Sequence, residues 1–292
     1  MRNQQVLYVS YDGMTDPLGQ SQVLPYICGL ADLGYRFTLL TSEKPERMKA
    51  VGGLIREICK KHNIDWVPLI FHTQPKLISK VYDVRCLKRK AVALYKSKKF
   101  EMVHCRSYVG VDVGLHLKRK YGVRVLFDMR GFWVDERVDG NMWNLKNPIY
   151  KYAFRYYKNK ENNYVANADH IVSLTEAGKR EVQKWKGYRN AEISVIPCSA
   201  DFNVFTLLTK EEKQKARIAL GLPEEGLVLS YLGSIGSWYL LPEMLSLFAL
   251  TKEKYPEVKF LFVTSGNPDL ILAEAEKIAD KKRRYRNTFC FT

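Results

Sequence analysis

The sequence contains no run of about 18 apolar residues, the length that a helix needs to cross a bilayer, so we expect no transmembrane helix. Its N-terminus also lacks the long apolar core of a secretory signal, which predicts a cytoplasmic protein. The 6 cysteines, at positions 28, 59, 86, 105, 198 and 290, form no C-x-x-C pair. We therefore expect free thiols rather than disulfides or a zinc site.

Two common phosphate-binding motifs are also missing. No G-x-G-x-x-G occurs, which argues against a dinucleotide-binding domain. Gly13 and Gly19 are too far apart for the phosphate loop G-x-x-x-x-G-K-[ST], and Gln20 stands where that motif has lysine. Any phosphate site in this chain must therefore use another kind of loop.

The sequence has an excess of positive charge. It holds 47 Lys and Arg against 31 Asp and Glu, a formal net charge of +16. Such an excess implies an acidic partner, which can be nucleic acid, an anionic membrane surface or a phosphorylated substrate. We expect no nucleic acid, because the basic residues are spread over many predicted elements and no nucleic-acid-binding motif occurs.

Two predicted helices carry many of these charges. Basic helices with interleaved aromatic residues can lie on anionic lipid head groups, which would place the protein peripherally at the inner face of the plasma membrane. The alternative is an ordinary solvated helix face. The residues are Lys88, Arg89, Lys90, Lys96, Lys98 and Lys99 on or after one helix, and Lys146, Lys151, Arg155, Lys158 and Lys160 among Tyr150, Tyr152, Tyr156 and Tyr157 at the other.

The first forty residues predict a β-α-β unit. A buried strand (6–10) is followed by a turn-rich loop (11–18), a helix and a second strand (36–41). A helix N-terminus after such a loop suits phosphates, because its free N–H groups and dipole attract anions. We expect Gly19 to open the helix, Gly34 to end it, and its apolar face to carry Val23, Ile27, Leu30 and Leu33.

The same alternation continues along the chain. Strands are predicted at 64–71, 102–106, 123–129, 170–174 and 193–197, and helices at 77–98, 109–121, 148–168 and 176–185, with a long loop at 130–147. A polar linker (201–226) separates this N-terminal domain (1–200) from a further set of strands and helices (227–292). The apolar strands predict an α/β fold with parallel sheets covered on both faces. The second domain is expected to be incomplete.

Several segments together resemble the family 4 glycosyltransferases, which are retaining enzymes of the GT-B type. The matching segments, in order, are DPLGQSQV after the first strand, MVHCRS (102–107), FDMRGFW (127–133), HIVSLTEAGKREV (170–182), VIPCSADFNVF (195–205) and LVLSYLGSIGSWYLLPEML (227–245). The resemblance implies two Rossmann-like domains, an N-terminal one on the acceptor side and a C-terminal one that binds a nucleotide-sugar. It also implies that no metal ion or other cofactor is needed.

Site candidates come from the resemblance and from position in the sheet. By similarity, the loop with Gly19 and Gln20 lies against the donor's diphosphate and sugar. Ligands bind at the carboxyl ends of strands in such sheets, where Arg106 and Ser107 are expected. In the long loop the candidates are Arg130, Trp133 and Glu136, and Phe132 with Trp133 could form an aromatic platform for a sugar. In the second domain, Gly233, Ser234 and Gly236 are expected near the donor phosphates. Asp201 is expected to be a hinge residue.

The chain also departs from the family's pattern. Arg106 stands where many members carry histidine, and Ser234 and Tyr239 stand where members have an arginine and a lysine. The family's E-x7-E carboxylates are expected beyond residue 292. His104 and Asp128 are interpreted as structural, and the catalytic residues stay unassigned.

The sequence thus predicts a glycosyltransferase that moves a sugar from a nucleotide-sugar to a glycan or lipid-linked acceptor in cell-surface polysaccharide or glycolipid assembly. The alternative is a non-catalytic, truncated binding module.

Overall fold

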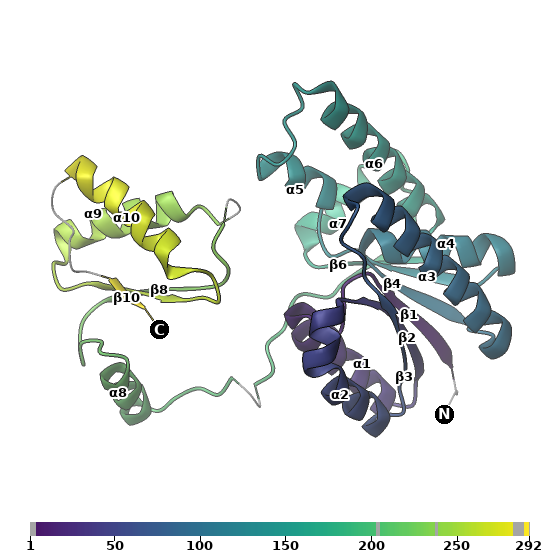
Figure 1. Cartoon of the computed structure of the whole chain (residues 1–292), viewed down its shortest axis with the longest axis horizontal. Helices are drawn as coiled ribbons and strands as arrows, with labels where there is room; N and C mark the ends of the chain where they lie inside the picture. Colours follow the sequence, from purple (N-terminus) through teal and green to yellow (C-terminus); the bar gives the residue numbers. More distant parts are fainter. Residues whose placement is uncertain (1–3, 203–204, 237–238, 283–288, 292) are drawn as a thin grey trace. The chain divides into compact units, whose positions relative to one another are not determined.

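The computed structural model describes residues 4–202, 205–236, 239–282 and 289–291 (Figure 1). The chain divides into two compact units. The first unit comprises Met1–Glu136 and Asn144–Cys198, and the second comprises Arg137–Trp143 and Ser199–Thr292. Each unit has its own parallel sheet.

The first unit is built on a seven-stranded sheet in the order β3-β2-β1-β4-β5-β6-β7, with every pair parallel. The order reverses between β1 and β4, which is where ligands bind in sheets of this kind. The strands are β1 (Gln5–Ser10), β2 (Arg36–Glu43), β3 (Asp65–Ile70), β4 (Met102–Arg106), β5 (Arg124–Asp128), β6 (His170–Ser173) and β7 (Glu192–Val195).

Helices cover both faces of this sheet, with α1 and α2 on one face and α3 and α4 on the other (Figure 1). The alternation of side chains along the strands explains the two layers. Val6 and Tyr8 of β1 pack in the cluster that holds Ile27 and Ile55, whereas Cys105 of β4 lies against α4. The helical segments are η1 (Gly19–Val23), α1 (Leu24–Asp32), α2 (Pro45–Lys61), α3 (Lys76–Lys98), α4 (Ser107–Tyr121), α5 (Trp133–Asp139), α6 (Pro148–Asn167) and α7 (Glu176–Gln183). The predicted α/β class is confirmed.

Two helices were not expected from the sequence. The α2 helix fills residues that carried no prediction, although Pro45 at its start and the buried Ile55 and Cys59, four residues apart, are typical helix signals. The α5 helix lies within the stretch predicted as a long loop (130–147). That part of the sequence has few apolar residues, so the regular apolar spacing that predicts a helix is weak there.

The expected apolar face of the first helix is partly wrong. Gly19–Val23 is π-helical, and the helix proper ends at Asp32. Leu33 is therefore the C-cap, and 72% of its surface is exposed. The π-helical segment has a wider turn than an α-helix and shifts the phase of the residues before and after it.

The second unit has a three-stranded parallel sheet in the order β10-β9-β8, made of β8 (Val228–Leu232), β9 (Lys259–Val263) and β10 (Phe289–Phe291). Its core includes Phe248, Phe260 and Ile271. Its helices are α8 (Lys210–Ala219), α9 (Leu241–Lys254) and α10 (Pro268–Lys282). Parts of three segments that the sequence singled out lie outside the described residues. They are Asn203 and Val204, Ser237 and Trp238, and Thr288.

Two further expectations concern the whole chain. Among the helices that the structure describes, none is long and apolar enough to cross a membrane. The five cysteines whose side chains are described are free thiols, as expected: Cys28, Cys59, Cys86, Cys105 and Cys198.

Candidate functional site

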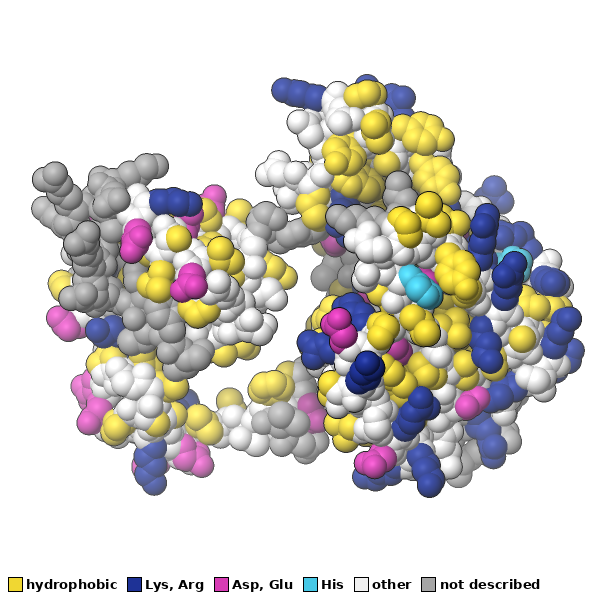
Figure 2. Space-filling model, in the orientation of Figure 1, with side chains coloured by type: hydrophobic (Ala, Val, Ile, Leu, Met, Phe, Trp, Pro, Cys, Tyr) yellow, Lys and Arg dark blue, Asp and Glu magenta, His cyan; other side chains and the backbone are white. Residues whose placement is uncertain are grey.

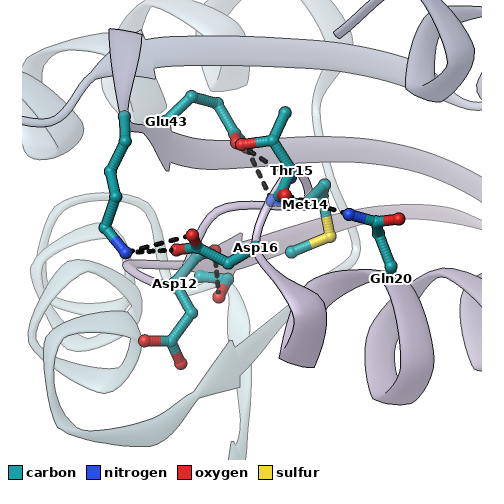
Figure 3. A network of polar contacts seen from close by, with 8 residues as sticks. Asp12, Met14, Thr15, Asp16, Gln20 and Glu43 are labelled. Carbon is teal, nitrogen blue, oxygen red and sulfur yellow. Dashed lines mark hydrogen bonds and ion pairs between the residues drawn. The ribbon is translucent and has the colours of Figure 1, made fainter. Parts of the chain in front are cut away.

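The loop after β1 is held by a buried carboxylate at the end of β2. Glu43 accepts hydrogen bonds from the backbone N–H groups of Met14 (2.8 Å) and Thr15 (3.1 Å) and from the Thr15 hydroxyl (2.6 Å), as Figure 3 shows. The Thr41 hydroxyl donates to the same carboxylate at 2.5 Å. A buried carboxylate with this many donors fixes the loop conformation before any ligand binds.

Two glycines allow this arrangement. A Cβ on Gly13 would lie 2.5 Å from Glu43 Oε2, and a Cβ on Gly19 would lie 2.1 Å from the carbonyl oxygen of Gly13. Gly19 is therefore required for close packing of the loop on the first helical turn. Gln20 also serves the loop, because its Nε2 donates to the carbonyl of Thr15 at 2.9 Å (Figure 3). Helical residues begin at Pro17 rather than at Gly19.

Two candidate arginines meet at the carboxyl ends of β4 and β5. Gln22 Oε1 accepts from Arg106 Nη2 (3.1 Å) and from Arg130 Nη2 (3.4 Å). Arg130 also lies 3.5 Å from Asp128 Oδ1. These residues are called the Gln22 cluster, and they bring together parts of the chain more than 80 residues apart in sequence. The cluster stands where strand order reverses in the sheet.

Asp128 is the buried anion of this cluster. Burial alone would raise the pKa of Asp128. His104, Arg130 and Arg106 favour its ionised form more strongly, so the pKa is lowered. His104 Nε2 lies 3.5 Å from Asp128 Oδ2, and the His104 ring contacts Tyr8 with a centroid distance of 4.5 Å. Both residues are buried, which agrees with the structural role expected for them.

Beside the Gln22 cluster lies a cavity of about 720 Å³, within the size range of small-molecule sites. Side chains from the loop after β1 and from α3, α4, α5 and α6 line it, and all belong to the first unit. Arg106, Ser107 and Trp133, three of the predicted site residues, face the same space. Ser107 has a positive φ of 59°, an uncommon conformation for a residue other than glycine.

The predicted pair of aromatic residues in the long loop is split. Phe132 packs against Trp185, two residues after the end of α7, with ring centroids 5.8 Å apart. Trp133 instead lines the cavity and contacts Tyr108 (5.8 Å) and Tyr157 (5.1 Å). The two aromatic residues therefore do not form one platform, since neighbouring residues at the start of α5 point in different directions.

A buried acid that sequence reasoning missed supports this aromatic wall. Glu161 of α6 accepts a hydrogen bond from the Tyr108 hydroxyl and pairs with Lys158 at 2.6 Å. Burial raises the pKa of Glu161 above its usual value although Lys158 opposes the shift. An acidic residue on a largely polar helix gives no sign in the sequence that it is buried.

Glu136 lies on α5 close to the preceding glycine, since a Cβ on Gly131 would be 2.4 Å from its Oε1. Its backbone N–H bonds the carbonyl of Phe132 at 2.9 Å. Glu136 is not among the residues that line the cavity.

The glycine-containing turn of the second unit uses some of its own polar groups. The Gly233 N–H donates to the carbonyl of Val263 at 3.1 Å, and the Tyr231 hydroxyl donates to the carbonyl of Ser234 at 2.8 Å. Helix α9 begins at Leu241, so the free N–H groups of its first turn lie beyond Gly233 and Gly236.

Two remaining expectations concern the hinge and metal ions. The carbonyl of Asp201 accepts the N–H of Phe205 at 2.8 Å. In the described parts of the chain, no group of three or more His, Cys, Asp and Glu side chains is arranged to hold a metal ion.

Comparison with known proteins identifies relatives of this chain. The family model described as Glycosyltransferase Family 4 matches residues 22–204. A D-inositol 3-phosphate glycosyltransferase of Corynebacterium urealyticum is 29% identical over 108 residues, which are 37% of this chain and 26% of that protein. The match therefore spans about a quarter of the curated relative's length.

Solved structures resemble both units. Anabaena HepE, crystallised with UDP and glucose, is 12% identical with a TM-score of 0.64, covering 99% of this chain and 68% of that one. Sucrose-phosphate synthase of Thermosynechococcus elongatus is 14% identical with a TM-score of 0.65, and the match covers 99% of this chain and 70% of that one. At such identities the likeness establishes the fold, which is the GT-B fold that the sequence predicts.

Proposed function

Since the chain belongs to glycosyltransferase family 4, we propose that it transfers a sugar from a nucleotide-sugar to a glycan or lipid-linked acceptor with retention of anomeric configuration. The family match over residues 22–204 is the observation that carries this proposal. The fold adds support, because the similar Anabaena protein was crystallised with UDP-glucose. We place the reaction in the assembly of cell-surface polysaccharides or glycolipids.

The Gln22 cluster is the part of the first unit best suited to an anionic or hydroxyl-rich substrate. Arg106 and Arg130 share one amide oxygen of Gln22, and this holds their guanidinium groups in place before a substrate arrives. Preorganised cations stabilise charge that develops on a departing diphosphate without the cost of reorganisation. We propose that they provide such stabilisation without a metal ion or other cofactor.

The outer surface of α3 and α6 fits the expected anionic membrane. Figure 2 shows apolar side chains gathered on the upper part of the first unit, with Lys and Arg side chains around them. On α6, Ile149 and Tyr152 are each 73% exposed and stand next to Lys151. Lys158 and Lys160 of the same helix are instead paired with Asp135 and Asp112, so only part of the basic set is available to lipids.

A donor screen tests the proposed reaction. The full chain is incubated with UDP-, GDP- and ADP-sugars, and release of the nucleoside diphosphate is measured. We expect release from one donor class and a loss of about a hundredfold in Arg106→Ala, as is typical when a charge-stabilising donor is removed. Arg119→Ala, an exposed change on α4, serves as the control. No release above buffer from any donor would contradict the proposal.

A second candidate is a binding module without catalysis. Ser234 and Tyr239 stand where members of the family carry an arginine and a lysine, and this favours weaker binding of the diphosphate. This candidate predicts nucleotide-sugar or glycan binding with no turnover. The donor screen, combined with calorimetric binding of the same donors, separates it from the enzyme.

A further inference from the structure

The cavity beside the Gln22 cluster has a buried floor with a cationic group on it. Arg106 is only 5% exposed, and its Nε has no hydrogen-bond partner among the described residues. The carboxylate of Asp12 is 3.7 Å away. Arg106 therefore adds a buried positive charge beside the cavity.

The cavity walls add more positive charge than negative. Five basic and two acidic side chains line it. One of the acids, Asp112, is already paired with Lys160 at 2.5 Å. Arg85 and Lys88 lie one helical turn apart on α3, and neither forms an ion pair with a described residue. The charge balance of the walls therefore favours an anion.

Lys88 of the cavity wall has a lowered pKa. Burial lowers its pKa, Lys160 and Arg119 lower it further, and Asp112 acts in the opposite direction. A bound anion beside Lys88 would raise that pKa again, since an opposite charge favours the charged form of a lysine.

The rim of the cavity is apolar rather than charged. Val81 of α3 and Tyr156 of α6 line the cavity and are 52% and 48% exposed. One helical turn before these residues, Ile78 of α3 and Tyr152 of α6 are also exposed. A cationic interior and an apolar approach suit an amphiphile whose head group is anionic.

We propose that this cavity, here named the Lys88 cavity, binds the phosphate group of a lipid-linked acceptor, with its hydrocarbon chain against the exposed apolar side chains of α3 and α6. The proposal rests on the proposed function, because it names the acceptor class of that reaction. The phosphate contacts Arg85 and Lys88. A nucleotide diphosphate has the same anionic chemistry, so the test includes one.

Calorimetry on the full chain tests the proposal with water-soluble probes and needs no sugar transfer. The probes are dihexanoylphosphatidate, glycerol 3-phosphate, zwitterionic dihexanoylphosphatidylcholine, and UDP. We expect dihexanoylphosphatidate to bind at least about tenfold more tightly than each of the others, because only it combines a full phosphate charge with hydrocarbon chains.

Variants of two helices locate the binding. Arg85→Gln combined with Lys88→Gln should weaken phosphatidate binding by about tenfold or more. Lys60→Gln combined with Lys61→Gln removes the same charge from exposed positions of α2 and should change binding by less than about twofold. Val81→Ser should weaken phosphatidate binding but not that of glycerol 3-phosphate. Urea midpoints of all variants verify that each is folded.

Three results would overturn the proposal. The first is phosphatidate binding that the Arg85 and Lys88 changes leave intact, and the second is an equal loss in the Lys60 and Lys61 control. The third is UDP binding more tightly than phosphatidate and depending on Lys88, which would make the cavity a donor site. None of these three results would contradict the proposed sugar transfer. Lipid binding as expected, without nucleotide release from any donor, would contradict the proposed function alone.

Discussion

Glu43 and Thr15 are joined by two hydrogen bonds to one carboxylate oxygen, from the Thr15 N–H at 3.1 Å and from its hydroxyl at 2.6 Å. They lie at the carboxyl ends of neighbouring strands, and Glu43 is 2% exposed. This contact fixes the loop that leads into the first helix. The loop's shape is therefore set by a buried acid 28 residues away in the sequence.

Glu43→Gln tests that contact. Each carboxylate oxygen accepts one backbone N–H, so an amide NH₂ on either side leaves a buried N–H group without an acceptor. We expect a loss of about 2 kcal/mol in the free energy of unfolding, measured by urea denaturation. Glu46→Gln removes the same charge from an exposed position in the first turn of α2 and should cost no more than about 0.5 kcal/mol. Equal losses in the two variants would contradict the account.

Two glycines of the same region should respond in opposite ways to alanine. Gly19→Ala places a Cβ 2.1 Å from a backbone oxygen, and we expect a loss of stability of about 1–3 kcal/mol. Gly29→Ala lies in α1 with no atom within 4 Å of the new Cβ, and we expect a gain of up to about 1 kcal/mol from helix propensity. The measurement is the thermal midpoint of each variant. A neutral Gly19→Ala would show that the loop relaxes freely.

The buried Asp128 should make stability depend on pH. Its pKa is lowered in the folded chain, so its ionised form stabilises the fold above the unfolded pKa of about 3.9, and that stabilisation is lost as the pH falls below it. Relative to Asp128→Asn, the native chain should therefore lose its advantage as the pH decreases from neutrality through 4 to lower values. Urea denaturation across this range measures the difference. A stability difference between the native chain and Asp128→Asn that stays constant or grows as the pH falls would contradict a lowered pKa of Asp128.

Vesicle sedimentation tests the membrane surface. We expect the chain to sediment with vesicles of phosphatidylserine and phosphatidylcholine at low salt. Lys151→Gln with Arg155→Gln should weaken partitioning by roughly thirtyfold, because each basic side chain near an anionic bilayer contributes about 1 kcal/mol. The matched control is Lys213→Gln with Lys215→Gln on α8. No binding at any ionic strength, or equal effects of the two pairs, would exclude a docking role for α6.

The strands and most helices of this chain could be predicted from sequence because their apolar patterns are strong. The continuous runs of β1 and β5 and the long period of α3 gave their positions within a residue or two. Helix α5 was missed because it is short and rich in charge. The phase of α1 was misjudged because a π-helical turn at Gly19–Val23 has no recognisable signal in sequence.

The site could be predicted only in part. Arg106 and Ser107 were found because they follow a buried strand, and Trp133 because it is an aromatic residue beside charged ones. Glu43 follows an apolar strand as well, but nothing in its neighbours says that the loop after β1 folds onto it. The bridging role of Gln22 and the contribution of Lys88 depend on contacts between distant segments, which local patterns do not encode.

The most direct test of the account follows the sugar itself. A donor with one isotope in the sugar and another in the nucleotide, chosen by the donor screen, is incubated with the full chain and lipid or glycan acceptors. We predict that the sugar label moves to the acceptor while the nucleotide label stays in the aqueous phase, and that Arg106→Ala slows the transfer by about a hundredfold whereas Arg119→Ala does not. Sugar label that never leaves the nucleotide, with any acceptor, would contradict the proposal that this chain is a sugar transferase.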